Sequence, residues 1–285
     1  VLSSCGNAKL STADAQFARG EFFDAAATYR KVYAKTSPRK ERALRGKIAY
    51  KMATCYRRMN AAPRATGAYQ KAIRYHYKDS MAYFYLARSF QMQGKYKDAI
   101  KNYNLFLERK PGDMLAKNGI RGCEMAVDWK KNPTRYVVKR ADLFNSRRSD
   151  CCPMFLGKDY DQLYFTSSTE KATGTRKSEI TGTKNNDIFF SKKDEKGAWT
   201  KPQIIEGELN SELDEGIISF SPDGTLMYLT KAPREPNADT SVEIYTSSRS
   251  GAKWGTPQKL EITGDTISVF AHPAVSPDGN YLYFT

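Results

Sequence analysis

The first half of the chain carries basic and aromatic residues at a spacing that could recognise a peptide. Lys47, Tyr50, Thr54, Arg57 and Arg58 hold the second, fifth, ninth, twelfth and thirteenth places of one segment. In an α-helix these places fall on one face, because a turn takes three to four residues. Ammonium and guanidinium groups pair with carboxylates, and aromatic rings take apolar side chains. This face therefore predicts binding of a peptide with acidic and apolar side chains.

The same spacing recurs in two neighbouring segments. Its places are held by Met81, Phe84, Arg88, Gln91 and Met92 in the following segment, and by Leu10, Asp14 and Phe17 in the preceding one. The three faces together predict a partner-binding groove that mixes basic, aromatic and methionine side chains. A generic basic face exposed to solvent is the alternative.

The sequence contains no residue set typical of an enzyme, which needs a nucleophile beside a base, a metal cluster or a phosphate-binding loop. Asp223 and Asp278 lie in Ser-Pro-Asp-Gly segments, which favour turns, so their carboxylates are expected to be structural. His272 stands at the entry to an expected strand and is interpreted as structural. His76 stands at the end of an expected helix and is interpreted as a partly exposed surface residue. The chain is therefore predicted to be non-enzymatic, with no catalytic residue.

No cofactor or metal site is predicted. A zinc site needs four ligands of the Cys and His type, and the sequence offers two histidines and no Cys-X-X-Cys pair. Cys151 and Cys152 are adjacent, and a disulfide between neighbours would be strained. Glu212, Asp214 and Glu215 could hold a cation, although a solvated acidic loop is the favoured interpretation.

The elements that position the groove are pairs of helices in a 34-residue repeat. Residues 80–113 place large apolar side chains on one face of each of two helices, with Gly94 at the turn between them and Pro111 after the second. This pattern resembles the tetratricopeptide repeat, or TPR. The resemblance implies an α-solenoid that binds proteins. The Lys and Asn residues of the TPR carboxylate clamp are not reproduced, so no free C-terminal carboxylate is predicted as ligand.

Two earlier units share this register. Residues 46–79 form the second unit, in which Asn60 replaces the turn glycine because Asn tolerates the left-handed conformation. Residues 6–39 form the first unit, and residues 40–45 are expected as an insertion. A single helix from Leu115 to about Lys130 is expected to cap the last apolar face of the stack.

The register also accounts for two cysteines. Cys55 and Cys123 hold the tenth place of their units, where Ala15 and Ser89 stand in the others. All four residues are small, which indicates a close approach between helices and a packing role for the thiols. The two units are not neighbours in the stack, so no Cys55–Cys123 bridge is predicted.

The second half of the chain changes to short aromatic and β-branched segments separated by turns, which is typical of strands. The ten residues from Ser221 recur from Ser276, and a Trp-X-X-Pro-Gln segment from Trp199 recurs from Trp254, both 55 residues on. This pattern resembles the PD40, or WD40-like, β-propeller repeat. The resemblance implies two blades at about residues 150–206 and 207–262 and the start of a third, with the propeller continuing beyond this sequence.

Net charge changes sign near the point where the expected secondary structure changes from helices to strands. Residues 1–145 hold 30 Lys and Arg against 11 Asp and Glu, a net charge of +19, whereas residues 146–285 hold 16 against 20, a net charge of −4. The asymmetry indicates anionic partners for the first half. Nucleic acid is not a predicted partner, because the charge is spread over helix faces without stacking aromatics in a nucleic-acid motif.

The first six residues, Val-Leu-Ser-Ser-Cys-Gly, resemble a bacterial lipobox, which would make Cys5 the lipidated residue. A free surface cysteine in an irregular terminus is the alternative. The predicted parts are a lipobox remnant with the lipidated cysteine at 1–5, TPR units with a capping helix at 6–131, a linker at 132–149 and a partial PD40 propeller at 150–285. The fold class is therefore a multidomain chain, α-helical first and β second.

TPR units followed by PD40 blades behind a lipobox resemble OmpA-family lipoproteins of Bacteroidetes that serve type IX secretion. That resemblance implies a non-enzymatic periplasmic scaffold, anchored to the outer membrane by its lipid, that binds proteins of the secretion or gliding machinery. Peptidoglycan would be bound only by a C-terminal domain that this sequence does not contain. The alternative is a propeller-based hydrolase or glycan-binding protein whose active residues lie in blades outside this sequence.

Overall fold

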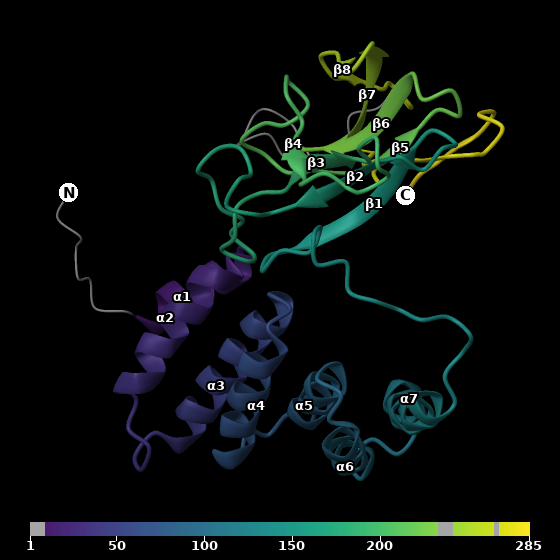
Figure 1. Ribbon diagram of the computed structural model, residues 1–285. Coiled ribbons are helices and arrows are strands. Elements are labelled where there is room, and N and C mark those ends of the chain that lie inside the picture. Colours follow the sequence, from purple (N-terminus) through teal and green to yellow (C-terminus); the bar gives the residue numbers. More distant parts are fainter. Residues whose placement is uncertain (1–8, 233–241, 265–267) are drawn as a thin grey trace. The chain divides into compact units, whose positions relative to one another are not determined.

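The computed structural model describes residues 9–232, 242–264 and 268–285 (Figure 1). Two compact units divide the chain, Val1–Val138 with Glu179–Gly182, and Lys139–Ser178 with Thr183–Thr285. Within the described ranges, no helix combines the length and apolarity that crossing a membrane requires. Cys5, the predicted lipidation site, lies outside the described residues.

The first unit is a stack of helices, each packed against the next along the chain. The described helices are α1 (Leu10–Ala18), α2 (Phe22–Lys35), α3 (Arg42–Arg58), α4 (Ala62–Arg74), α5 (Met81–Met92), α6 (Tyr96–Leu107) and α7 (Met114–Lys131). The helical first half predicted from the repeat is confirmed. The last four residues of the expected insertion at 40–45 form the first turn of α3.

Left-handed residues end the first helix of each helix pair. Gly20, Asn60 and Gly94 have φ of 84°, 55° and 70°, and each follows α1, α3 or α5 within two residues. Asn60 adopts the predicted conformation of the turn glycine that it replaces. The backbone can then reverse over a few residues, which lets each helix pair pack antiparallel.

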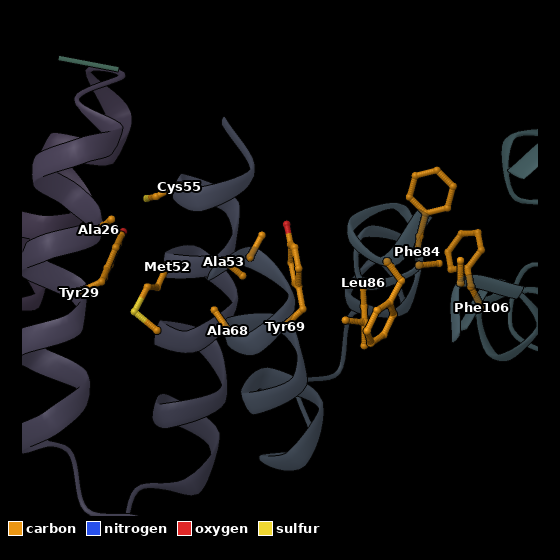
Figure 2. Packing of buried hydrophobic residues seen from close by; sticks show 14 of the residues in the cluster. Ala26, Tyr29, Met52, Ala53, Cys55, Ala68, Tyr69, Phe84, Leu86 and Phe106 are labelled. Atoms are coloured by element: carbon orange, nitrogen blue, oxygen red, sulfur yellow. The ribbon is translucent and has the colours of Figure 1, made fainter. Parts of the chain in front are cut away.

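The core of this unit is rich in alanine and contains one fully buried tyrosine for each pair of helices. Tyr29, Tyr69 and Tyr103 are 0%, 0% and 1% exposed, and the surrounding small residues let the helices approach closely (Figure 2). Cys55 and Cys123 are both buried free thiols, as the register predicts. Ser89 at the same place is also buried, whereas Ala15 is exposed, because among the described residues no helix covers that side of α1.

The second unit contains antiparallel sheets formed by strands that follow one another in sequence. One sheet has the order β1 (Asp150–Leu156), β2 (Gln162–Ser167), β3 (Asp187–Lys192), β4 (Gln203–Ile204). The next sheet has the order β5 (Glu215–Phe220), β6 (Leu226–Lys231), β7 (Glu243–Ser250), where β7 also pairs β8 (Lys253–Trp254) and β9 (Gln258–Lys259). The hairpin of β10 (Ala274–Val275) and β11 (Leu282–Tyr283) follows.

The sheets repeat one another in backbone detail. A β-bulge interrupts the first hairpin of each larger sheet, and Cys152 and Ile217 have φ of 54° and 41° at that bulge. His272 has φ of 59°, 55 residues after Ile217. Three different side chains share this conformation, so the repeat sets it rather than the residue type.

The Ser-Pro-Asp-Gly segments form the predicted turns. The Asp223 carboxylate accepts from the Ser221 hydroxyl at 2.5 Å and from the Thr225 backbone N–H at 3.1 Å, and Gly224 has φ of 71°. The second copy has the same bonds, from Ser276 and Asn280 to Asp278. Both aspartates are therefore structural residues of tight turns.

The two larger sheets pack face to face over an apolar core. Tyr164 and Ile188 of the first sheet meet Met227 and Leu229 of the second, and Trp254 closes one side. All five side chains are at most 6% exposed. This packing is typical of two stacked sheets, in which alternate side chains of each strand point toward the other sheet.

Candidate functional site

The predicted groove residues lie on α1, α3 and α5, the first helix of each pair, which we call the inner helices. Lys47, Arg58 and Arg88 are exposed, and no carboxylate of the described residues forms a salt bridge with them. Their positive charges are therefore available to a ligand. A cation without a partner on a surface can bind a carboxylate without first breaking an internal pair.

Asp14 is already bonded within the protein. The Tyr29 hydroxyl donates to its Oδ1 at 2.6 Å, and Lys51 Nζ, from α3, lies 2.7 Å from the same oxygen. Burial raises the pKa of Asp14, but the bonds from Lys51 and Tyr29 outweigh burial and hold the pKa below its usual value. The carboxylate is ionised at neutral pH and joins α1 to α3.

Arg57 lies against an aromatic ring on the next inner helix. Its guanidinium carbon is 4.2 Å from the ring centroid of Tyr85, which itself stacks on Tyr69 at 6.0 Å. The Nε atom of Arg57 is buried without a hydrogen-bond partner in the described part of the chain. The stack fixes the direction of this guanidinium.

Tyr50 and Thr54 take supporting positions on α3. The Tyr50 ring stacks on Tyr77 with centroids 4.4 Å apart and meets Tyr69 edge-on at 5.7 Å. Thr54 donates its hydroxyl to the Tyr50 carbonyl at 3.1 Å. These tyrosines pack against the Tyr50 ring, and burial raises the pKa of Tyr50 well above the usual range.

Several predicted groove residues pack inward, and Phe84 is the clearest correction. It is 5% exposed and its ring packs on Tyr103 and Phe106, because α6 covers this face of α5. Leu10 and Phe17 are half-buried against the same kind of core. These three side chains shape the helices and offer little surface to a ligand.

The other predicted groove residues of α5, Gln91 and the two methionines, also differ in how far a ligand could reach them. The Tyr103 hydroxyl donates to Gln91 Oε1 at 2.7 Å, which holds the amide in place. Met81 is half-buried, whereas Met92 is 59% exposed. Met92 is therefore the apolar residue of α5 that a partner can reach.

The inner face continues onto α7, which the sequence interpretation treated only as a cap. Counting from Met114, the same places of the repeat fall on Leu115, Asn118, Gly122, Met125 and Ala126. Leu115 is 68% exposed, and Trp129 farther along α7 is 63% exposed. The signal was present in the sequence, because Cys123 had already set the register of this helix.

Contacts between successive inner helices join these residues into one face. Asp14 meets Lys51 between α1 and α3, and Arg57 meets Tyr85 between α3 and α5. At Gly122 of α7, a Cβ atom would lie 3.3 Å from Gln91 Nε2 of α5. The exposed cations belong to α3 and α5, and the exposed apolar side chains belong to α5 and α7. The inner-helix face, as we call it, therefore runs from a basic part to an apolar part.

The acidic residues considered as a cation site do not converge. Asp214 accepts from both the backbone and the side chain of Asn186 at 2.8 Å. Glu215 is buried and pairs with Lys231 at 2.8 Å, where burial raises the pKa of Glu215 more than Lys231 lowers it. No group of three or more His, Cys, Asp or Glu side chains in the described ranges could hold a metal ion.

The histidines carry no catalytic arrangement among the described residues. His272 Nδ1 lies 3.0 Å from the Thr285 hydroxyl, and its backbone N–H donates to the Thr230 hydroxyl at 2.9 Å. His76 is exposed after the end of α4. Cys151 and Cys152 are both free thiols, and burial raises the pKa of Cys151 to about 11.

Comparison with known proteins agrees with the helical architecture. Residues 50–113 match the tetratricopeptide repeat family model. A search of curated proteins gave no match.

Three solved structures are similar to part of the chain. The C-terminal TPR-containing domain of an FK506-binding protein of Plasmodium falciparum is 15% identical, with 43% of this chain and 87% of that chain covered and a TM-score of 0.37. The first TPR of Spaghetti (RPAP3), bound to an HSP90 peptide, is 20% identical, with 41% and 89% covered and a TM-score of 0.36. The Sgt2 TPR domain of Aspergillus fumigatus is 18% identical, with 46% and 86% covered and a TM-score of 0.36. Tetratricopeptide repeats are therefore shown for residues 50–113 of the helical unit.

Proposed function

We propose that the chain is a non-enzymatic scaffold whose inner-helix face binds an acidic and apolar segment of a partner protein. The observation that carries the proposal is the set of exposed cations Lys47, Arg58 and Arg88 on α3 and α5, which form no salt bridge with any described residue. Acidic residues of the segment would pair with them. Apolar residues of the segment would lie against Met92 and Leu115.

A charge-reversal experiment tests this proposal. A library of displayed 12-residue peptides is selected on the protein, and the expected binders are rich in Asp and Glu together with Leu and Phe. Changing Lys47, Arg58 and Arg88 to Glu should weaken these binders by at least about tenfold. Arg57 is left unchanged, because its stack on Tyr85 is part of the packing.

The matched control changes the same charge on the second helices of the pairs. Lys31, Arg74 and Lys101 are exposed on α2, α4 and α6, and their change to Glu lowers the net charge equally. Equal loss of binding in both triple variants would mean that only overall charge matters. Binders without acidic residues would also contradict the proposal.

The sheets of the second unit are proposed as blades of a PD40 propeller. Support comes from the shared strand order, from the positive φ repeated at Cys152, Ile217 and His272, and from the interval of 55 residues between the turn motifs. A crystal or cryo-EM structure of the full-length protein should contain a closed ring of such sheets. A structure in which the sheets do not close into a ring would contradict this proposal.

The location proposed is the periplasm, with a lipid on Cys5 that anchors the protein to the outer membrane. The lipobox-like residues 1–6 support it. In cells that make the protein, mass spectrometry should find a diacylglyceryl group on Cys5, and Cys5→Ser should release the protein from membranes. An unmodified Cys5 thiol on a membrane-free protein would refute it.

The partners proposed are proteins of type IX secretion or gliding machinery, because the order of lipobox, TPR and PD40 repeats resembles PorE-type OmpA-family lipoproteins. Peptidoglycan would be reached only through a further C-terminal domain, and nucleic acid is not a proposed partner. Crosslinking in intact cells, followed by identification of the crosslinked proteins, tests the assignment. Crosslinks only to proteins outside that machinery would contradict it.

A further inference from the structure

A cleft of about 430 Å³ lies between the first and second sheets of the strand unit. Tyr164 and Phe190 line it from the first sheet, and Arg249 and Trp254 line it from the β7–β8 hairpin of the second. This volume is within the range of about 300–1,000 Å³ that small-molecule sites occupy. Both walls of the cleft belong to the same compact unit.

Arg249 lies at this cleft without a charged partner in the part of the chain that the structure describes. It pairs across the hairpin with Trp254, and its guanidinium carbon lies 5.8 Å from the Trp254 ring centroid. Its Nε is buried with no hydrogen-bond partner among the described residues, and its Nη2 has a long contact of 3.4 Å to Gln162 Oε1. A buried guanidinium donor without an acceptor calls for a ligand or water, because such groups are costly to leave unsatisfied.

The charge around the cleft has the opposite sign to its surroundings. Residues 146–285 have a net charge of −4, yet the cleft gathers Arg249, Lys192 and Lys253 against a single carboxylate, Glu206. None of the three cations forms a salt bridge with a described residue. This local excess of positive charge favours an anion.

A neutral donor completes the cleft. The Trp254 indole N–H donates to the Tyr164 hydroxyl at 3.3 Å, so the Tyr164 proton is left for another acceptor. Phe190 and the aromatic rings of these two residues supply an apolar wall. We propose that this cleft binds a small carboxylate-bearing ligand with an apolar face, its carboxylate on the Arg249 guanidinium and its apolar face on the aromatic wall. The site is separate from the inner-helix face and does not depend on the function proposed for it.

Two ligand sources share this chemistry, a sugar acid and the C-terminal residue of a peptide. Glucuronate and N-acetylphenylalanine represent them, and glucose and N-acetylphenylalaninamide are their neutral counterparts. Saturation-transfer NMR titrations with the whole chain should show tighter binding of at least one acid than of its neutral counterpart. The acid that binds identifies the source. If neither acid binds more tightly, the proposal is wrong.

Substitutions assign the binding to the cleft. Arg249→Met should raise the Kd of the acid by about tenfold or more, and Arg249→Lys should recover part of the loss, because it keeps the charge without the forked donors. The control Arg176→Met removes an exposed arginine of the same unit and should change nothing. The Lys47, Arg58 and Arg88 triple variant should also bind normally.

Arg249→Met could disturb the hairpin, so Lys253→Met gives a second measurement. Lys253 is exposed at the cleft, and its loss should weaken binding severalfold without a change in the circular dichroism spectrum. Unchanged affinity in folded Arg249→Met and in Lys253→Met would overturn the proposal.

Discussion

The two units bury polar groups in opposite ways. The helical unit lies within the half that carries a net charge of +19, yet its buried polar residues among those described are uncharged, namely Thr36, Thr66, Ser89 and Asn102. The strand unit belongs to the half with a net charge of −4, and it buries Asp187, Glu215 and Lys231. Net charge therefore says little about which charges a core contains.

The backbone explains the difference. Helices satisfy most of their own N–H and C=O groups, so uncharged hydroxyls and an amide suffice for the buried polar side chains of the helical core. The loops that connect strands contain backbone N–H groups with no partner in a sheet, and carboxylates accept hydrogen bonds from some of these groups. The Asp150 and Glu215 carboxylates, each at the start of a strand, accept the backbone N–H of the serine four residues earlier, at 2.5 Å and 3.0 Å. The buried charge of the strand unit is a part of its loop structure.

The strongest test of this contrast removes one buried charge. Lys231→Met leaves Glu215, which is fully buried, without its counter-ion, and this should cost the strand unit about 3–5 kcal/mol of unfolding free energy. Urea unfolding is followed by fluorescence of Trp199 and Trp254 in a Trp129→Phe background. The matched helical variant Lys51→Met removes the partner of half-exposed Asp14 and should cost under about 1 kcal/mol, measured by circular dichroism at 222 nm.

A double variant controls for the loss of packing. Lys231→Met with Glu215→Gln removes both charges and should recover most of the stability, because no buried charge is then left unpaired and the amide oxygen still accepts the Ser211 N–H. Equal destabilisation by Lys231→Met and Lys51→Met would break the comparison between the units.

A smaller effect is expected from hydroxyls in the helical core. Tyr29→Phe removes a bond to the ionised Asp14 and should cost about 1.5–3 kcal/mol, whereas Tyr103→Phe removes a bond to the neutral Gln91 amide and should cost about 1 kcal/mol. The two tyrosines are equally buried, so each controls for the other. Urea midpoints measured by circular dichroism decide the order, and a larger loss at Tyr103 would contradict it.

Much of the helical unit could be predicted because its repeat ties residue type to position. One register gave the turn at Asn60 and the buried thiols of Cys55 and Cys123. The burial of Phe84 could not be read from its groove position, because it depends on how closely α6 approaches α5. The exposed face of α7 could also have been predicted, because Leu115 holds the second place of its unit, which Lys47 and Met81 hold in theirs. From the sequence, α7 was assigned only a capping role.

The strand unit was less predictable for a physical reason. Strand segments and turns follow local patterns, but the ion pair of Glu215 and Lys231 depends on the register of β5 against β6, which pairs these two residues. Cys152, Ile217 and His272 have positive φ, but none of them is glycine, so the residue type does not indicate this backbone conformation. The Arg249 cleft depends on how two sheets face each other. Long-range pairing of this kind leaves little trace in a local sequence pattern.

Close packing in the helical unit gives a third prediction. A Cβ atom at Gly119 would lie 2.4 Å from Cζ of Tyr103, so Gly119→Ala forces that buried ring to move. The expected loss of about 1–3 kcal/mol should exceed the gain of about 1 kcal/mol in helix propensity. Gly67→Ala is the matched control, because nothing lies within 4 Å of its Cβ and the helix gain should remain. Thermal unfolding measures both variants. If Gly119→Ala and Gly67→Ala both stabilise the protein, the core around Tyr103 is looser than this contact implies.

The smallest expected effect is a difference in acid response between Asp14 and Asp187. Bonds from Lys51 and Tyr29 outweigh burial and hold the pKa of Asp14 below 3.8, so its contribution to stability is present above pH 3.8 and is lost as pH falls through the lowered pKa. Burial raises the pKa of Asp187 above 3.8, and its Oδ1 has no partner among the described residues. Its contribution is therefore present below pH 3.8 and is lost as pH rises through the raised pKa.

Acidification from pH 7 to about pH 4 should thus spare the helical unit and slightly stabilise the strand unit, while further acidification should weaken the helical unit first. Asp187→Asn should raise stability at pH 7 and remove the gain on acidification, because an amide keeps the acceptor for the Thr173 N–H without a buried charge. Asp14→Asn should lower stability at pH 7 and flatten the acid limb of the helical unit. Urea unfolding at several pH values, read by both probes, distinguishes the units. Parallel pH profiles for the two aspartate variants would mean that the units do not differ in how they hold their carboxylates.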